Sequence, residues 1–363
     1  MPVSHETLRM AGEIRITIDR NVDNVTRDLV QAWGKAWRTL IVDWDAARRE
    51  IQDAWDRGEK PTRSQVLRFE KVTRAIVATR DVLDDLGQMA GVRVLQDVDQ
   101  MLHLTAHAQT QIIASQLPQG SSAALLRASL VRADQDQIAA IIRRVTQTVT
   151  SKTAAFGPVG EQILLDELIR GVALGTNPRV VAGEIIDAGG FIESMQGAFT
   201  ATLNDAMVIA RTELLDATRA AAQVAQNANA EVLTGWMWLA QLDTRTCPSC
   251  WGQHGSIHDL DESGPDDHQQ GRCARMPVVK PWRDLGFAIP EPPSVVPDAQ
   301  EVFAGLSPAE QLQVMGPTRL AALDAGEVTW EQLSMVRHTS GWRRSFVPAP
   351  VRSIRRRRLR RVV

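Results

Sequence analysis

The longest periodic segment of the sequence is the feature that most limits the fold. From Val22 onward, apolar residues recur at intervals of three and four: Val25, Leu29, Trp33, Trp37, Leu40, Trp44, Ala47, Ile51 and Trp55. This spacing keeps them on one face of an α-helix, which takes 3.6 residues per turn. We therefore predict one long amphipathic helix that ends near Gly58 and Pro61. Its tryptophans are expected to pack in a core, not to stack on nucleic-acid bases.

A second long helix is predicted directly after this break. Thr62 or Ser64 can cap it, and its apolar face comprises Val66, Phe69, Val72, Ile76, Leu83 and Leu86. Two long helices joined by a short turn pack as an antiparallel hairpin. Ahead of the first helix, the alternation of Ile14, Ile16 and Ile18 indicates one short strand.

Helical periodicity continues beyond a loop at Pro118 to Gly120, from Leu125 to Val149. A break at Phe156 to Pro158 separates it from the next predicted helices, which cover 161–174, 178–188 and, rich in alanine, 199–232. The pair around Asn177 has the outline of a helix-turn-helix, but its second helix carries only Arg179 as a base. DNA reading by this pair is therefore not expected.

The expected protein is mainly α-helical and has four parts. A long N-terminal helical hairpin covers 1–120, and a helical middle domain covers 121–280 and holds a small zinc-knuckle module at 210–277. An extended, proline-rich C-terminal arm with short helices follows over 281–350, where Ser307 begins one helix. An arginine-rich tail ends the sequence over 351–363. A length of 363 residues suits two or three structural units.

The charge distribution sets the tail apart from the rest. Seven arginines lie in the last twelve residues: Arg352, Arg355, Arg356, Arg357, Arg358, Arg360 and Arg361. The formal net charge of −2 includes these seven, so the remainder carries −9. Such a tail favours a polyanion or an acidic protein surface. No apolar run is long enough for a membrane span, and the N-terminus lacks the pattern of an export signal.

The three cysteines of the chain predict a metal site. Cys247 and Cys250 form a Cys-x-x-Cys pair, His268 follows, and Cys273 comes five residues later. An odd number of thiols with this spacing fits a metal in a reducing cytosol better than disulfides. Thiolates and an imidazole are ligands that tetrahedral zinc prefers, and a closed Cys3His set makes the zinc structural. His254 or His258 could replace His268 as the fourth ligand.

The polar loop between the cysteine pair and His268 supports a structural role for that metal. The residues from Trp251 to Asp267 offer little apolar surface, so a hydrophobic core is not expected to hold the ends of this loop together. The binding free energy of a structural zinc becomes folding free energy. Metal ligation is therefore expected to fold this loop.

Motifs around these cysteines carry a family resemblance. They are Ala210-Arg211-Thr212-Glu213 on the alanine-rich helix, Gly235 to Trp238, Asp243 to Cys250, Gly255, and His268 ahead of Cys273. Together they resemble the phage head morphogenesis family, the minor capsid proteins similar to the Mu minor head protein. The resemblance covers Leu164 to Pro277, and Gly316 to Arg319 with Gly326 is similar to the family's downstream segment. The stretch Gln269 to Arg272 departs from the family, which often has proline and closely spaced cysteines after the histidine.

The resemblance implies a protein without catalytic residues, made in the host cytoplasm and carried inside the virion. Its expected place is the portal vertex, in several copies around the portal. The expected partners are the portal protein, the capsid interior and, through the basic tail, packaged double-stranded DNA. Arg211 and Glu213 are the family's structural signature, and we expect them to clamp the zinc loop.

A zinc-supported nuclease or another DNA-processing protein is the alternative function. Asp266, Asp267 and His268 would then supply the acid and the base. Such nucleases usually use a second cysteine pair for zinc, which leaves the histidine free, and this sequence has no second pair.

Overall fold

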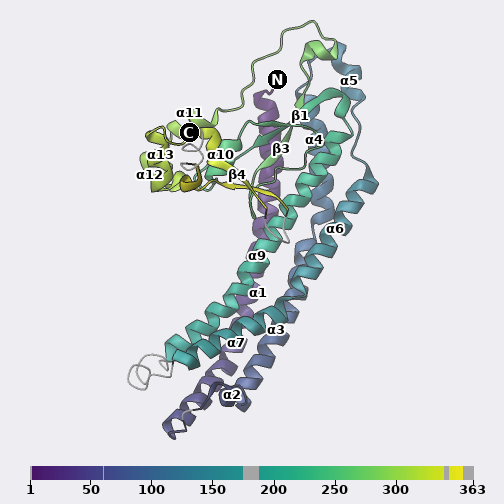
Figure 1. Ribbon diagram of the computed structural model, residues 1–363. Helices are drawn as coiled ribbons and strands as arrows, with labels where there is room; N and C mark the ends of the chain where they lie inside the picture. The colour runs from purple at the N-terminus through teal and green to yellow at the C-terminus, as the bar shows by residue number, and fades with distance from the viewer. Residues whose placement is uncertain (1, 60, 175–187, 339–342, 355–363) are drawn as a thin grey trace. The chain divides into compact units, whose positions relative to one another are not determined.

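The computed structural model describes residues 2–59, 61–174, 188–338 and 343–354 (Figure 1). Most of these residues are helical and few lie in strands, which confirms the mainly α class. The helices are α1 (His5–Asp56), α2 (Arg63–Val66), α3 (Glu70–Leu95), α4 (Val98–Ser115), α5 (Ala124–Ala128), α6 (Gln135–Thr153), α7 (Phe156–Leu174), α9 (Ala188–Asn227), α10 (Pro248–Gln253), α11 (Ala299–Ala304), α12 (Pro308–Met315) and α13 (Pro317–Asp324). The strands are β1 (Leu233–Leu239), β2 (Ile257–His258), β3 (Ala274–Val279), β4 (Ser334–Arg337) and β5 (Ser345–Pro348). None of the described helices is long and apolar enough to span a membrane.

The contacts divide the chain into two compact units. The first unit comprises 1–19, 99–143 and 214–363, and the second comprises 20–98 and 144–213. The helices α1, α6 and α9 each contribute residues to both units.

Residues 20–98 of the predicted helical hairpin lie in the second unit, whereas 1–19 and 99–120 belong to the first. Arg93 of α3 pairs with Asp28 of α1 at 2.6 Å, and further along α1, Trp44 Nε1 donates to Thr79 Oγ1 at 3.0 Å. Glu50, near the end of α1, accepts a hydrogen bond from the backbone of Lys71 at the start of α3. Contacts that advance along α1 therefore move backward along α3, so the two helices are antiparallel.

The tryptophan face of α1 forms the core of this unit, as predicted. Trp33, Trp37 and Trp44 are buried, and Trp55 is half-buried. Trp33 Nε1 donates to Thr202 Oγ1 at 2.9 Å, and the Trp37 ring packs on Phe199 with centroids 5.6 Å apart. Because the indole N–H groups of Trp33 and Trp44 find partners inside the core, these two rings can be fully buried.

We expect Trp44→Ala to destabilise the protein by about 3–5 kcal/mol, because it removes a fully buried ring and leaves a cavity. Val42→Ala is the matched control on the same helix, where the valine is 66% exposed and its loss should cost less than about 0.5 kcal/mol. Urea denaturation followed by circular dichroism measures both. Equal losses for the two variants would contradict the core role of this face.

Several predicted boundaries differ from the structure. Ile14, Ile16 and Ile18 lie inside α1, so the predicted strand is wrong. Buried Ala11 and Ile18 continue the apolar face to Val22 at helical spacing, which outweighs a three-residue alternation. The predicted break at Phe156 is the start of α7, whose first turn accepts Pro158 because no helical N–H bond is needed there.

Two further boundaries concern the middle of the chain. The helix expected from Leu125 to Val149 is interrupted between α5 and α6, and α9 begins at Ala188 instead of Phe199. The expected helix 178–188 lies outside the described residues, except for its last residue, and so does Asn177.

A three-stranded antiparallel sheet positions the metal centre in the first unit. Its strand order is β2-β1-β3, and Leu239 at the end of β1 pairs with Ala274 at the start of β3. Met237 and Met276 pack on Ile112 of α4 and on Ala11 of α1, and these elements lie side by side in Figure 1. The strand pair is therefore anchored on two helices.

The segment after the sheet folds on α10. The residues 286–298 have no regular secondary structure, and Ser307 caps α12 through a capping box with Glu310, as predicted. The β4–β5 hairpin was not predicted from the sequence. Helices α11 to α13 and this hairpin enclose a small core around Trp251 of α10.

Candidate metal centre

The turn from Cys247 to Cys250 aims two sulfur atoms at one point. Cys247 is the N-cap of α10, and its Sγ accepts a hydrogen bond from the backbone N–H of Cys250 at 3.5 Å. Pro248 occupies the first helical turn, where its fixed φ suits a helix start and its missing N–H costs nothing. The local sequence therefore builds a two-thiol knuckle.

The sheet brings the other two predicted ligands to this knuckle. Cys273 directly precedes Ala274, which pairs with Leu239 just before the chain leaves the sheet toward Cys247. His268 lies five residues before Cys273, in the turn that leads into β3. Pairing of β1 with β3 thus closes a loop whose two ends both carry ligands.

The side chains form a cluster that can hold a metal ion. The ligand atoms of Cys247, Cys250 and His268 lie within 4.8 Å of one another, as do those of Cys250, Asp267 and Cys273. Zinc bonds to sulfur of about 2.3 Å place neighbouring tetrahedral ligands roughly 3.8 Å apart, so the spacing within each group is compatible with zinc ligands. Cys250 belongs to both groups, so the four predicted ligands lie in two groups that share this residue, and the second group also contains Asp267.

The electrostatics of the cluster favour a cation. The hydrogen bond with Cys250, assisted by His268, lowers the pKa of Cys247 to about 4, although burial opposes this. The contact with Cys247 raises the pKa of His268 to about 9. A thiolate is the metal-binding form of cysteine, and a metal ion would displace the proton held by His268.

The two alternative histidines lie elsewhere in the module. His258 stacks on Trp236 with centroids 4.3 Å apart, and its ring nitrogens contact Glu262 at 2.7 Å and Ser256 at 2.9 Å. His254 Nδ1 accepts a hydrogen bond from the backbone of Ala240 at 3.1 Å. The structure brings neither into the described cluster, whereas it does bring His268 there.

Contrary to our prediction, none of the described contacts of Arg211 and Glu213 reaches the metal loop. Both belong to the second unit, where Arg211 pairs with Asp23 at 3.1 Å and Glu213 pairs with Lys152 at 2.5 Å. Both residues lie about two turns before Arg219, the residue of α9 that contacts the loop. The motif's arginine is therefore too early in the helix for the role that we predicted.

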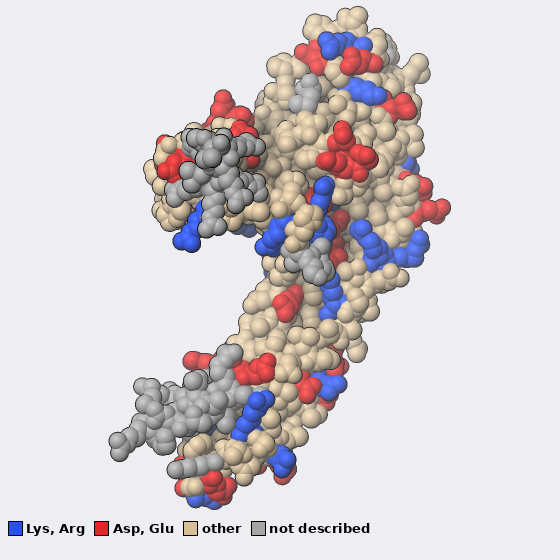
Figure 2. Space-filling view, in the orientation of Figure 1, with Lys and Arg blue, Asp and Glu red and all other residues tan. Residues whose placement is uncertain are grey.

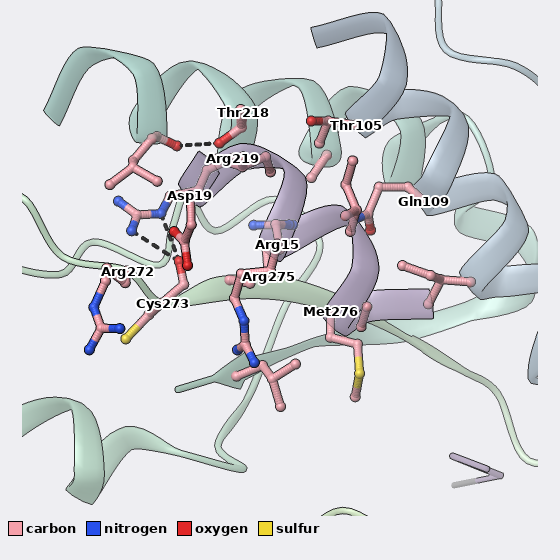
Figure 3. A pocket seen from close by; sticks show the side chains of 18 residues that line it. Arg15, Asp19, Thr105, Gln109, Thr218, Arg219, Arg272, Cys273, Arg275 and Met276 are labelled. Carbon is pink, nitrogen blue, oxygen red and sulfur yellow. Dashed lines mark hydrogen bonds between the residues drawn. The ribbon is translucent and has the colours of Figure 1, made fainter. Parts of the chain in front are cut away.

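Arg219, which the sequence reasoning missed, holds the loop instead. Its buried Nη2 donates to Asp267 Oδ2 at 2.8 Å and to the carbonyls of Gly271 and Cys273 at 2.6 and 3.0 Å. Its Nη1 donates to Asp216 at 2.8 Å, one turn earlier on α9. Figure 3 shows the bonds from Arg219 to Cys273. The i, i+3 spacing of an aspartate and an arginine was the only sequence signal for this contact.

Arginines from the C-terminal hairpin complete this network. Arg343 donates to both carboxylate oxygens of Asp216 and to the carbonyl of Asp267, and Arg344 donates to Asp266 Oδ2 at 3.0 Å. Asp266 and Asp267, the residues that the nuclease alternative needs as acid and base, are thus both paired with arginine. These ion pairs hold the loop, and Asp267 also belongs to the second group of close ligand atoms.

Packing also supports the knuckle, in contrast to our expectation for this loop. Trp251, directly after Cys250, is fully buried, and its ring meets Phe303 and Trp330 edge-on at 5.6 and 6.5 Å. The expectation that the loop lacks a core is therefore wrong at its first residue. The apolar partners come from more than fifty residues further along the chain, where the sequence gives no local sign of the contact.

The hydrogen bonds of Asp243 make the stability of the module depend on pH in the acid range. Arg272 donates to both of its carboxylate oxygens at 2.7 and 2.9 Å, and Thr246 donates at 2.8 Å. Partial burial raises the pKa of Asp243, but these hydrogen bonds outweigh it and hold the pKa at about 2, below the usual 3.8.

Because the folded pKa is the lower one, the ion pair stabilises the protein above about pH 4, and this stabilisation is lost as the pH falls toward 2. We expect Asp243→Asn to cost about 1 kcal/mol at pH 6, a value reduced for the solvent exposure of the pair, and almost nothing near pH 2. Urea denaturation of both proteins across this range measures the difference. A constant difference would contradict the assignment.

Residues 162–276 match the family model described as Phage Mu protein F like protein. This segment is similar to that family, and we call it the Mu F-like segment. The match supports the family resemblance that the sequence motifs predicted. Comparison with curated proteins and with solved structures gives no match. The Mu F-like segment contains the four predicted ligands, Arg219, β1 and the first three residues of β3.

Proposed function

We propose that this protein is a minor head morphogenesis protein of a tailed phage, carried in the virion, and that zinc stabilises its Mu F-like segment. The family match carries the first part, and the two groups of close ligand atoms that share Cys250 support the second. Bound zinc would supply folding free energy by joining the two ends of the loop. A Cys3His set leaves no position for a substrate water, so the proposed role of this metal is structural and not catalytic.

The proposal includes binding of packaged double-stranded DNA by the arginine tail. The rest of the chain carries a formal charge of −9, and Figure 2 shows acidic and basic side chains interspersed on the described surface in view. The concentration of positive charge at one end of the sequence favours the tail as the part that meets phosphates. Such binding is independent of base sequence and weakens with salt.

Truncation after Ser353 tests the tail, because it removes six arginines and keeps Arg352. Fluorescence anisotropy with a duplex oligonucleotide at several salt concentrations should give a steep salt dependence for the full chain. The slope of the logarithm of the binding constant against the logarithm of salt concentration should be less steep for the truncated protein. The difference should be about 0.9 for each phosphate contact removed, or roughly 5 for six contacts. Equal binding by both proteins at low salt would contradict DNA binding by the tail.

The proposed partner in the head is the portal protein, with several copies around the portal and contact with the capsid interior. Co-purification with the portal protein of the same phage tests this partner. We expect the full chain and the chain truncated after Ser353 to be retained equally, which would separate portal binding from DNA binding. Retention of the full chain alone would assign the portal contact to the tail, and retention of neither would contradict the portal as partner.

A further inference from the structure

A small cavity beside the metal centre is used by none of the groups described above. Its volume is about 50 Å³, which is room for about four water molecules at roughly 10–15 Å³ each. Side chains from α1, α4, α9, β1 and β3, and from the two residues before β3, line it, all within the first unit (Figure 3). Much of the wall is aliphatic: Ala11, Ile14, Ile18, Ile112, Leu215 and Leu239. This wall is suited to carbon atoms, not to an inorganic ion.

Four arginines also line the cavity, and three of them are already engaged. Arg219 pairs with Asp267 and Asp216, as described above, and Arg272 pairs with Asp243. Arg275 lies over the Trp236 ring at 4.5 Å and donates to Gln226 Oε1 and to the carbonyls of Leu260 and Glu262. These three guanidinium groups are held by the protein itself.

Arg15 is the exception among them. Within the described residues, its guanidinium makes no hydrogen bond and no ion pair, and its Nη1 atom is covered by protein without an acceptor. Asp19, one turn further along α1, accepts a hydrogen bond from Gln241 Nε2 at 2.9 Å. Burial lowers the pKa of Arg15, although Asp19 acts in the opposite direction. A covered donor without an acceptor costs on the order of 1–3 kcal/mol, and more when it is charged.

From this combination of an aliphatic wall and one unpaired guanidinium, we propose that the cavity binds a small aliphatic monocarboxylate. The carboxylate pairs with Arg15, and the carbon chain lies against Ile14, Ile18 and Leu239. Arg15 is the one cation in the described lining whose guanidinium makes no hydrogen bond, and the Asp19 carboxylate beside it is bonded to Gln241. Sulfate or phosphate would place unbonded oxygens against aliphatic carbons, which is costly. The carboxylate belongs to a free short-chain acid or to the last residue of a protein chain.

Isothermal titration calorimetry of the full chain with isobutyrate tests this site. Isobutyramide, which has nearly the same shape but no charge, is the matched ligand control. We expect one isobutyrate per chain and at least tenfold weaker binding of the amide. Equal binding of acid and amide, or no binding of either, would overturn the proposal.

Variants of α1 assign the binding to Arg15. Arg15→Gln should weaken isobutyrate binding at least tenfold, and Arg15→Lys should retain part of it because the charge remains. Arg9→Gln, on an exposed part of the same helix, should leave it unchanged. Unchanged binding in Arg15→Gln would overturn the assignment. N-acetylvaline, which mimics the end of a protein chain, distinguishes the two sources: tighter binding than isobutyrate assigns the site to a chain end, and weaker binding assigns it to a free acid.

Discussion

Replacing Cys250 with serine is expected to reduce bound zinc from one ion per chain to almost none and to unfold the β1–β3 module. Cys250 is the one residue that belongs to both groups of close ligand atoms, so its loss divides the cluster. Structural zinc contributes about 10–16 kcal/mol in small zinc-binding peptides, and the loss of one of four ligands should remove several kcal/mol of stability. Elemental analysis of purified protein and thermal denaturation measure the two effects.

Ser249→Ala is the matched control for this variant. Ser249 is adjacent, equally buried and hydrogen-bonded to Ser334 through its hydroxyl, but its side chain is not in the cluster. It should lose about 1 kcal/mol and keep its zinc. A strong chelator should give the wild-type protein the same low melting temperature as Cys250→Ser. If the chelator leaves the melting temperature unchanged, or if the wild type contains no zinc, the metal proposal is wrong.

Arg219→Leu should lower the free energy of unfolding by about 3–5 kcal/mol. The change leaves the buried carboxylate of Asp267 without its main partner and frees the carbonyls of Gly271 and Cys273. It should also weaken zinc binding by about 10–100-fold, because residues that orient metal ligands contribute to affinity on this scale. Arg219→Lys should recover only part of the loss, since one ammonium group cannot replace a planar fork with several donors.

Two comparisons separate this buried network from ordinary surface charge. Arg211→Leu removes a more exposed ion pair on the same helix and should cost less than about 1 kcal/mol. Adding Asp267→Asn to Arg219→Leu should restore part of the lost stability, because the uncompensated charge is then absent. Urea denaturation and competitive zinc titration measure these effects. If Arg211→Leu and Arg219→Leu behave alike, Arg219 does not hold the loop in the way that we infer.

The sequence by itself determined those parts of the protein that depend on near neighbours in the chain. The apolar face from Leu29 to Trp44 predicted a helix with a buried side because its spacing follows the turn of a helix. The short break after this helix predicted its antiparallel partner. The Cys247 to Cys250 knuckle could be predicted because its backbone turn is local, and the order of His268 and Cys273 identified the side chains that the sheet then brings near it.

Only the tertiary structure decided which charged and aromatic groups support the metal loop. Arg219 and Arg343 meet at Asp216 and Asp267, and Trp251 is buried by Phe303. The stability of these contacts depends on the free energy of removing charged groups and aromatic rings from water. Because the contacts join segments that are far apart in the chain, no local sequence pattern indicates them. For the same reason Arg211, although part of a recognisable motif, pairs with Asp23 in the helical hairpin, and the arginine two turns later clamps the loop.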